Sequence, residues 1–335
     1  AGSFIVKSAQ AFRPAILDSF EPQDHPMDFA YPGGPPVRPY DITGWTVASQ
    51  MGVQFDRVME AFDAPSQPIG FKLEVPKAAK ISGPASPAGW LVSHRINDAF
   101  ILTNRLLKAN ADVYWLKAEQ MADGKSLGSG TVWIPATAAS KPIVERAARE
   151  LGIAAYGLAT APKGEAMKLK PIRIGLVDTY GGSMPSGWTR WILEKFEFNF
   201  EVVFPQVLDA GNLKSNFDVV VFPSGTFSEG RGGRGGGRGG FGPSPDTIPE
   251  EFRSMLGSVT VAKSIPPLKA FVEAGGTVMA VGSAASIGKS MGLPVEDHLV
   301  EMFEGKERKL PGDKFYIPGS VLRANFDNTV PLAYG

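Results

Sequence analysis

A valine-rich run near residue 220 constrains the fold of this chain more than any other segment. The run, Asp218-Val219-Val220-Val221-Phe222, is apolar on both faces of an extended chain and is followed by Pro223. It is too short for most buried helices, and β-branched residues suit a strand that is covered on both sides. The run therefore predicts a central strand of a parallel sheet.

The segments around this run alternate between strand and helix patterns. Parallel strands joined by helices of about ten residues place those helices on the faces of one sheet. From residue 170 to residue 335 we therefore expect one α/β domain. Its expected strands are 172–177, 200–203, 218–222 and 277–281, and its expected helices are 188–196, 207–213, 284–291 and 248–274, the last broken at Pro266-Pro267. Residues 315–317 and 320–326 alternate like edge strands.

The first half of the chain also alternates between strand and helix patterns, but only after a proline-rich segment. Residues 1–80 are rich in proline and predict an extended linker, with a short helix over 41–51 and strand-like pieces over 71–75. Residues 81–165 predict a small or partial α/β domain. Its expected strands are 89–93, 113–116, 131–134 and 154–158, and its expected helices are 98–108 and 141–151. The expected fold class is thus α/β, with two consecutive flavodoxin-like parallel-sheet units after a proline-rich extended segment.

The composition excludes several kinds of partner and chemistry. Thirty-four Lys and Arg balance thirty-four Asp and Glu, so net charge favours neither nucleic acid nor an anionic membrane as the main partner. The absence of cysteine excludes disulfides, thiolate metal sites and a cysteine nucleophile, and it suits an exported bacterial protein. The sequence contains no run of eighteen apolar residues, so it predicts no membrane-spanning helix. The start at Ala1 lacks an initiator methionine, so we expect a processed or excised piece.

Three turns follow expected strands of the second domain and are candidates for a binding site. In an open parallel sheet, ligands gather at the carboxyl ends of the strands. The candidate residues are Asp178 after the first strand, Ser224 and Gly225 after the central strand, and Gly282 and Ser283 after the later strand. We expect these turns to form the edge of one pocket.

The third turn resembles the nucleophile turn of class I glutamine amidotransferases. The carrier of the resemblance is Gly275-Gly276-Thr277-Val278-Met279-Ala280-Val281-Gly282-Ser283-Ala284, in which Gly282 or Ser283 stands where that family has its cysteine. A serine nucleophile at Ser283 would need an adjacent general base, and His298 is the only histidine within reach in sequence. Ser283 also lacks the Gly-x-Ser-x-Gly surround of a hydrolase. We therefore expect a degenerate site that keeps the shape of the turn, with a serine hydrolase as the alternative.

No metal site is expected within this chain. His298-Leu299-Val300-Glu301 matches the His-x-x-Glu pair of zinc carboxypeptidases, but no histidine follows Glu301 to supply a third ligand. His25 and His94 lack a ligand-like neighbour in the sequence. We expect these histidines to be packed or solvated.

A loop rich in arginine and glycine carries Arg231, Arg234 and Arg238. Such a segment can bind RNA through backbone charge and stacking, yet glycine-rich insertions more often act as spacers. A binding or assembly role for this loop stays an alternative. The six tryptophans, Trp45, Trp90, Trp115, Trp133, Trp188 and Trp191, lie mostly within strand or helix patterns, so we expect core packing in preference to a carbohydrate platform.

Several stretches along the chain resemble the region that follows the catalytic domain in large exported bacterial zinc carboxypeptidases. The carriers are Ala9–Pro14, Leu17–Pro22, Pro39-Tyr40-Asp41-Ile42-Thr43-Gly44-Trp45, Gln50–Val53, Ser186-Gly187-Trp188-Thr189-Arg190-Trp191, Asp209–Leu213, the Asp218 strand and Pro318–Ser320 leading to Pro331–Gly335. The resemblance implies an N-terminal zinc carboxypeptidase-like domain as partner, a peptide substrate of that parent protein, and secretion or periplasmic location. It implies zinc in the parent catalytic domain and no cofactor in this chain. None of the family's catalytic residues can be carried onto these positions, because they would precede Ala1.

We therefore expect a non-catalytic accessory region of a metallocarboxypeptidase-like protein that serves proteolysis by supporting the peptidase domain or substrate access. The resemblance also implies that the family pattern continues past Gly335. The two alternatives are a free-standing amidotransferase-like hydrolase using Ser283, and a module that binds through Arg231, Arg234 and Arg238.

Overall fold

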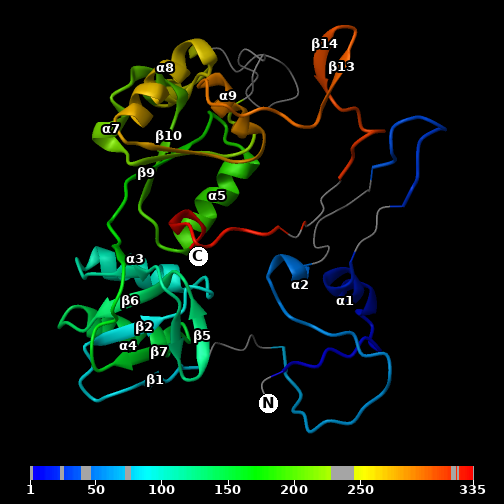
Figure 1. The fold of residues 1–335 in the computed structure, drawn as a ribbon. Helices are drawn as coiled ribbons and strands as arrows, with labels where there is room; N and C mark the ends of the chain where they lie inside the picture. The colour runs from blue at the N-terminus through cyan, green and yellow to red at the C-terminus, as the bar shows by residue number, and fades with distance from the viewer. Residues whose placement is uncertain are drawn as a thin grey trace. The chain divides into compact units, whose positions relative to one another are not determined.

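A computed structural model describes residues 3–22, 26–38, 47–71, 77–227, 245–317, 322 and 324–334 (Figure 1). Contacts between residues group the chain into two compact units. One comprises Ala1–Lys72 with Glu296–Phe326, and the other comprises Leu73–Val295 with Asp327–Gly335. The sequence boundaries near residues 80 and 165 stay predictions, and residues 296–326 group with the start of the chain and not with the parallel sheet.

The first unit has little regular structure in its described part. It contains the helices α1 (Arg13–Phe20) and α2 (Val47–Gln50) and a hairpin of β13 (Val300–Phe303) and β14 (Lys306–Lys309). The expected helix 41–51 is described from Val47 onward only. Residues 72–75 of the expected strand pieces lie outside the described residues. Residues 315–317 do not form the expected edge strand, and residues 320, 321 and 323 lie outside the described residues.

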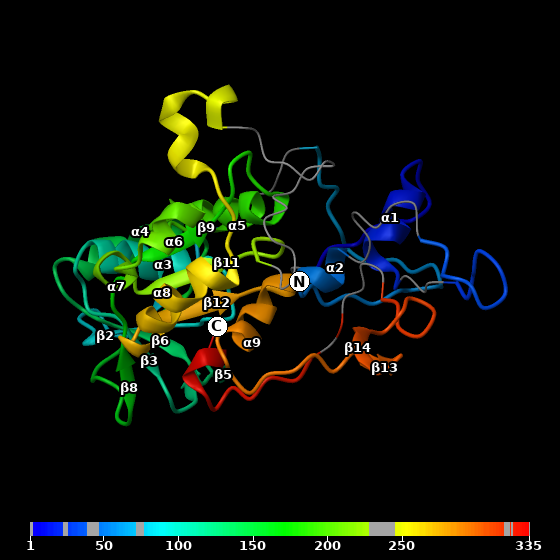
Figure 2. The same ribbon diagram turned by 90° about the horizontal axis from the view of Figure 1, so that it is seen from above.

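The described part of the second unit contains a six-stranded and a four-stranded sheet, each flanked by helices (Figures 1 and 2). The mixed-sheet half, residues 81–168, has six strands in the order β1-β7-β2-β6-β3-β8. Its helices α3 (Ala99–Lys108) and α4 (Ser140–Glu150) pack on one face around Leu102, Leu106 and Val144. The hairpin of β4 (Gln120–Ala122) and β5 (Lys125–Gly128) packs on the other face of the sheet. The strands of the sheet are β1 (Ile81–Ser82), β2 (Gly89–Val92), β3 (Tyr114–Leu116), β6 (Thr131–Pro135), β7 (Ala155–Leu158) and β8 (Ala166–Lys168).

The expectation of a parallel sheet over residues 81–165 is wrong. Only β1 and β7 pair in parallel, whereas β2 pairs antiparallel with both β6 and β7, and β3 pairs antiparallel with β6 and β8. The helices do connect strands of the same direction, but another strand is inserted between them in the sheet. This order, β7-β2-β6-β3, is that of a ferredoxin-like β-α-β-β-α-β unit. Sequence periodicity cannot reveal such an insertion, because it gives the type of each element and not its neighbours.

The parallel-sheet half, residues 174–290, has four strands that all run in one direction. Their order is β10-β9-β11-β12, and the predicted central strand β11 lies between β9 and β12. Val220 and Phe222 face the helices α6 and α8, and Val221 faces the opposite side with Leu193 of α5. The strands are β9 (Ile174–Val177), β10 (Phe200–Val203), β11 (Val219–Phe222) and β12 (Thr277–Ala280), and the helices are α5 (Met184–Lys195), α6 (Pro205–Ala210), α7 (Leu213–Asn216), α8 (Val261–Glu273) and α9 (Ile287–Ser290). The short 3₁₀ helices are η1 (Pro245–Thr247), η2 (Glu250–Met255), η3 (Gly282–Ser286) and η4 (Pro331–Ala333).

Helix α8 continues through Pro266-Pro267, so the expected break there is wrong. An interior proline costs about 3 kcal/mol, because it removes a hydrogen bond and its ring meets the preceding turn. Ile265, Leu268 and Phe271 of the same helix are buried, and each such burial contributes about 1.5–3 kcal/mol. Thr260 caps the start of the helix by accepting a hydrogen bond from the Lys263 N–H. The burial of these side chains and the Thr260 cap thus offset the free-energy cost of the two prolines.

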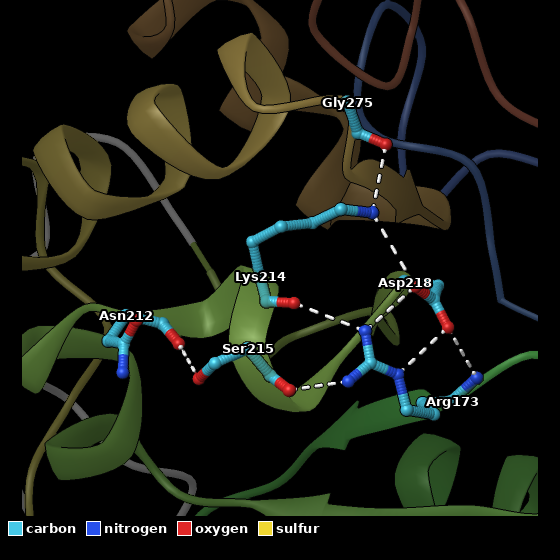
Figure 3. Close-up of polar contacts among 6 residues, drawn as sticks. All are labelled: Arg173, Asn212, Lys214, Ser215, Asp218 and Gly275. Atoms are coloured by element: carbon cyan, nitrogen blue, oxygen red, sulfur yellow. Dashed lines mark hydrogen bonds and ion pairs between the residues drawn. The ribbon is translucent and has the colours of Figure 1, made fainter.

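A polar cluster joins the amino ends of β9 and β11 (Figure 3). The guanidinium of Arg173 donates to both carboxylate oxygens of Asp218, from Nε at 3.0 Å and from Nη2 at 2.9 Å. It also donates to the carbonyls of Lys214 and Ser215 at the end of α7, while Lys214 Nζ donates to the Gly275 carbonyl at 3.2 Å. The cluster fixes the register of β9 and β11, and so aligns the opposite ends of these strands where the candidate turns lie.

Candidate functional site

Two of the three predicted turns meet at the carboxyl edge of the parallel sheet. Strands β11 and β12 are neighbours, with Phe222 level with Ala280, so both chains leave the sheet at the same height. The hydroxyl oxygens of Ser224 and Ser283 lie 3.2 Å apart and share a hydrogen bond. The N–H of Gly225 donates to Ser283 Oγ at 2.9 Å, and the N–H of Ser283 donates to Ser224 Oγ at 3.3 Å. The sequence therefore located four residues that the fold brings together: Ser224, Gly225, Gly282 and Ser283.

Gly282 has the backbone conformation that distinguishes this turn. Its φ of +60° lies in the left-handed region, which a residue with a Cβ adopts only at a cost. A Cβ at Gly282 would lie 2.7 Å from Ser224 Oγ and 2.9 Å from Ser224 Cβ, so a side chain there has no room unless Ser224 moves. The conformationally unusual first residue of η3, two positions after the end of β12, is therefore a glycine, and Ser283 follows it.

Ser283 is an exposed residue, and its hydroxyl has polar, uncharged hydrogen-bond partners. Its hydrogen-bond partners among the described residues are Ser224 Oγ and the Gly225 N–H, neither of which can act as a general base at neutral pH. His298, the histidine considered as a base, belongs to the other compact unit. The described contacts of Ser283 hold its hydroxyl in place without activating it.

The Asp178 backbone bonds to the neighbouring strand β10, and its carboxylate has a local contact within the described chain. It follows β9, its N–H donates to the Val203 carbonyl at 3.0 Å, and its carboxylate accepts from the Thr179 N–H at 2.8 Å. No hydrogen bond between Asp178 and the Ser224–Ser283 pair occurs in the described part of the chain. The three predicted turns therefore do not form one hydrogen-bonded cluster.

The remaining sequence candidates give no site in the described residues. Arg231, Arg234 and Arg238 lie outside the described residues, as does His25. Glu301 of the His-x-x-Glu match forms ion pairs with Arg308 at 2.6 Å and with Lys314, and these contacts hold the pKa of its carboxyl below the usual range. Within the described ranges, no group of three His, Cys, Asp or Glu side chains could hold a metal ion.

His94, which the sequence analysis expected to be packed or solvated, is a half-buried side chain. It lies against a cavity of about 20 Å³ lined by His94, Ala99, Phe100, Thr103, Trp115 and Val132. Both ring nitrogens are buried without a hydrogen-bond partner in the described structure. Burial, with a smaller contribution from the charge of Arg95, lowers the pKa of His94, and the nearby Leu127 backbone offsets part of that shift although it lacks hydrogen-bond geometry. His94 is therefore a titratable side chain whose ring nitrogens are enclosed by the fold.

The tryptophan expectation holds for part of the set. Trp90 and Trp133 are buried in the mixed-sheet half, and Trp115 packs edge-to-face on Tyr334 at 6.0 Å between ring centroids. Trp188 and Trp191 are 62% and 54% exposed on α5, so core packing is wrong for these two. Trp45 lies outside the described residues.

Comparison with known proteins finds no relative of this chain. Neither a family model, nor a curated protein, nor a solved structure matches the chain. In the described part of the chain, no helix is long and apolar enough to cross a membrane. Any function must therefore be argued from the site and from the residues themselves.

Proposed function

We propose that this chain is a non-catalytic accessory region of a bacterial, exported zinc carboxypeptidase-like protein. The proposal rests on the sequence resemblance to the region that follows such catalytic domains. In this role the parallel-sheet half would be an amidotransferase-like domain without its nucleophile. Its strand order β10-β9-β11-β12 matches the first four positions of the flavodoxin-like order, which supports the amidotransferase-like assignment.

Gly282 is the observation that carries the proposal. In an amidotransferase-like turn, the nucleophile occupies the conformationally unusual position between strand and helix. Here that position has φ +60°, carries no side chain, and has no space for one beside Ser224. A nucleophilic side chain at position 282 would require both a different residue and a displaced Ser224.

The accessory role follows from what this site can do without a nucleophile. The two hydroxyls and the Gly225 N–H stabilise each other across the β11 and β12 turns, so they act as a polar clamp between neighbouring strand ends. Zinc and the peptide-cleaving groups would belong to the domain that precedes this region in the parent protein. The chain would then support that domain or shape the access of peptides to it.

The serine hydrolase alternative has one feature in its favour, the exposed position of Ser283. A serine-directed fluorophosphonate followed by mass spectrometry separates the two proposals. The accessory role predicts no adduct on Ser283 at concentrations that fully label an active serine hydrolase. A stoichiometric adduct that disappears in Ser283→Ala would favour the hydrolase.

Parentage is tested by reading the gene upstream of the codon for Ala1. The proposal predicts an upstream coding sequence in the same frame that contains His-x-x-Glu and a later histidine, the three ligands of a catalytic zinc. A reading frame that begins at Ala1, or an upstream region without these ligands, would overturn it.

A further inference from the structure

Helix α5 differs from the other long helices of its unit in the side chains that it leaves exposed. The helices α3, α4 and α8 each bury apolar side chains along one face, whereas Ser186 is the buried residue of α5, a helix that is described in full. Its exposed side chains include Met184, Trp188, Trp191 and Ile192, with 78%, 62%, 54% and 47% of their surface accessible. A helix with apolar side chains on opposite sides is expected to be covered on both.

The exposed tryptophans point away from the sheet. The Ser186 hydroxyl donates to the Val177 carbonyl at 3.2 Å, and Leu193 packs against the cluster of Ile174, Leu176 and Val221, so these two residues mark the inner side of α5. At 100° per residue, Trp188 lies about 200° from Ser186 and Trp191 about 200° from Leu193. Trp188 and Trp191 therefore lie on the outer side, where they contact each other edge-to-face at 6.0 Å.

The exposed apolar surface of α5 is large enough for the centre of a protein interface. A tryptophan buries about 150–250 Å² when covered, so two that are more than half exposed offer roughly 250 Å². Met184 and Ile192 extend the surface along the same helix. A stable interface buries about 800 Å² on each partner, so α5 would supply the apolar centre and its surroundings the remainder.

The spacing of the side chains suits a second copy of α5. The midpoint of Met184–Lys195 lies between Thr189 and Arg190, and Trp188 and Trp191 are equally far from it. If two copies pack antiparallel about a two-fold axis at this midpoint, Trp188 of one copy meets Trp191 of the second copy. Met184 then meets Lys195 of the second copy, and the aliphatic stem of a lysine can cover apolar surface. Arg190 and Glu194 pair within the helix at 2.9 Å, and the zero net charge of the chain gives no long-range repulsion between copies.

We propose that the outer face of α5 is a self-association surface, on which two copies of the chain pack antiparallel around Trp188 and Trp191. The proposal is independent of the accessory role, because it rests on the side chains of α5 and not on the Ser224–Ser283 turns.

Sedimentation velocity over a range of chain concentrations tests the interface. We expect the intact chain to dimerise, and W188S/W191S to raise the dissociation constant at least tenfold while far-UV circular dichroism stays unchanged. The matched control is V261S/V272S, which changes two exposed apolar residues of α8 and should leave the dissociation constant unaltered. A chain that is monomeric throughout, or a tryptophan variant that dimerises like the intact chain, would overturn the proposal.

Cross-linking tests the antiparallel arrangement, and the absence of cysteine makes each introduced thiol unique. M184C and K195C keep both tryptophans. A short bis-maleimide should couple a mixture of these two variants faster than either variant alone at equal total concentration. Faster coupling of M184C to itself would contradict the antiparallel packing.

Discussion

The guanidinium of Arg105 on α3 binds the carboxylate of Glu197, which follows α5, and so joins the mixed-sheet half to the parallel-sheet half. Nε lies 3.0 Å and 3.1 Å from the two carboxylate oxygens, and Nη2 lies 2.7 Å from one of them. Asn104 strengthens the same junction by donating from its side-chain amide to the Phe196 carbonyl at 2.8 Å. Glu197 makes this contact from the left-handed region, with φ +58°.

Because Glu197 has a left-handed backbone conformation, we expect glycine at this position to be less destabilising than alanine. Glu197→Ala should lower the free energy of unfolding by about 1–2 kcal/mol, because a charge-assisted, partly buried contact is lost. Glu197→Gly loses the same contact but gains about 1 kcal/mol relative to alanine at a left-handed position. Urea denaturation measures both values. Equal losses in the two variants would show that the φ of Glu197 has no energetic consequence.

Asp218 should contribute to stability against acid. Its pKa is lowered chiefly by the hydrogen bond from the Arg173 side chain, with the Arg173 N–H adding to it. Because the folded pKa is below the unfolded value near 3.8, the contribution is complete above about pH 4 and is lost as the pH falls further. Asp218→Asn should therefore unfold with a shallower acid dependence below pH 4.

The matched control for Asp218 is Asp178→Asn, since Asp178 follows the other end of β9 and has local contacts in the described chain. The Arg173–Asp218 cluster stays intact in Asp178→Asn, so the difference between the two variants measures what that cluster contributes. If Asp218→Asn keeps the full acid dependence, the Arg173 cluster does not set it.

Gly282 and Ser224 should be energetically coupled. Gly282→Ala is expected to cost about 1–2 kcal/mol for the left-handed Cβ alone, and more because that Cβ meets Ser224. In a Ser224→Gly background the steric part disappears, so the cost of Gly282→Ala should fall. A double-mutant cycle by urea denaturation measures this coupling, and additive effects would contradict the contact.

His94 should make stability depend on pH near neutrality. Its folded pKa is below the unfolded value of 6.5, so the unfolded chain binds the proton first. The contribution of neutral His94 to the free energy of unfolding is then fully present above about pH 6.5, and it decreases as the pH falls towards the folded pKa. His94→Leu removes the titrating group from the cavity and should flatten this decrease below about pH 6.5. The exposed His298→Gln serves as control, and an unchanged slope in His94→Leu would refute the assignment.

The parts of the fold that could be predicted from sequence are those in which one short pattern decides the outcome. The valine run gave β11 because four apolar residues between Asp218 and Pro223 fit a covered strand and little else. Ser224 and Ser283 could be paired in advance because the carboxyl ends of neighbouring parallel strands meet at one edge. Gly282 was located for the same reason.

The errors arise where neighbours far apart in sequence decide the outcome. The turn at Asp123-Gly124, with φ values of 48° and 72°, closes the β4–β5 hairpin, and this Asp-Gly signal could have been found in the sequence. The insertion of β6 between β2 and β3 depends on pairing that no local pattern records. Trp188 and Trp191 have helical spacing, but which side of α5 meets the sheet is set by Ser186 and Leu193.

The central claim, a non-catalytic accessory region, is tested most directly by measuring zinc content and carboxypeptidase turnover on the purified chain of residues 1–335. After incubation with zinc and removal of the excess, the account predicts far less than one zinc per chain and no release of C-terminal residues from peptides above the uncatalysed rate. One tightly bound zinc per chain together with such turnover would contradict it.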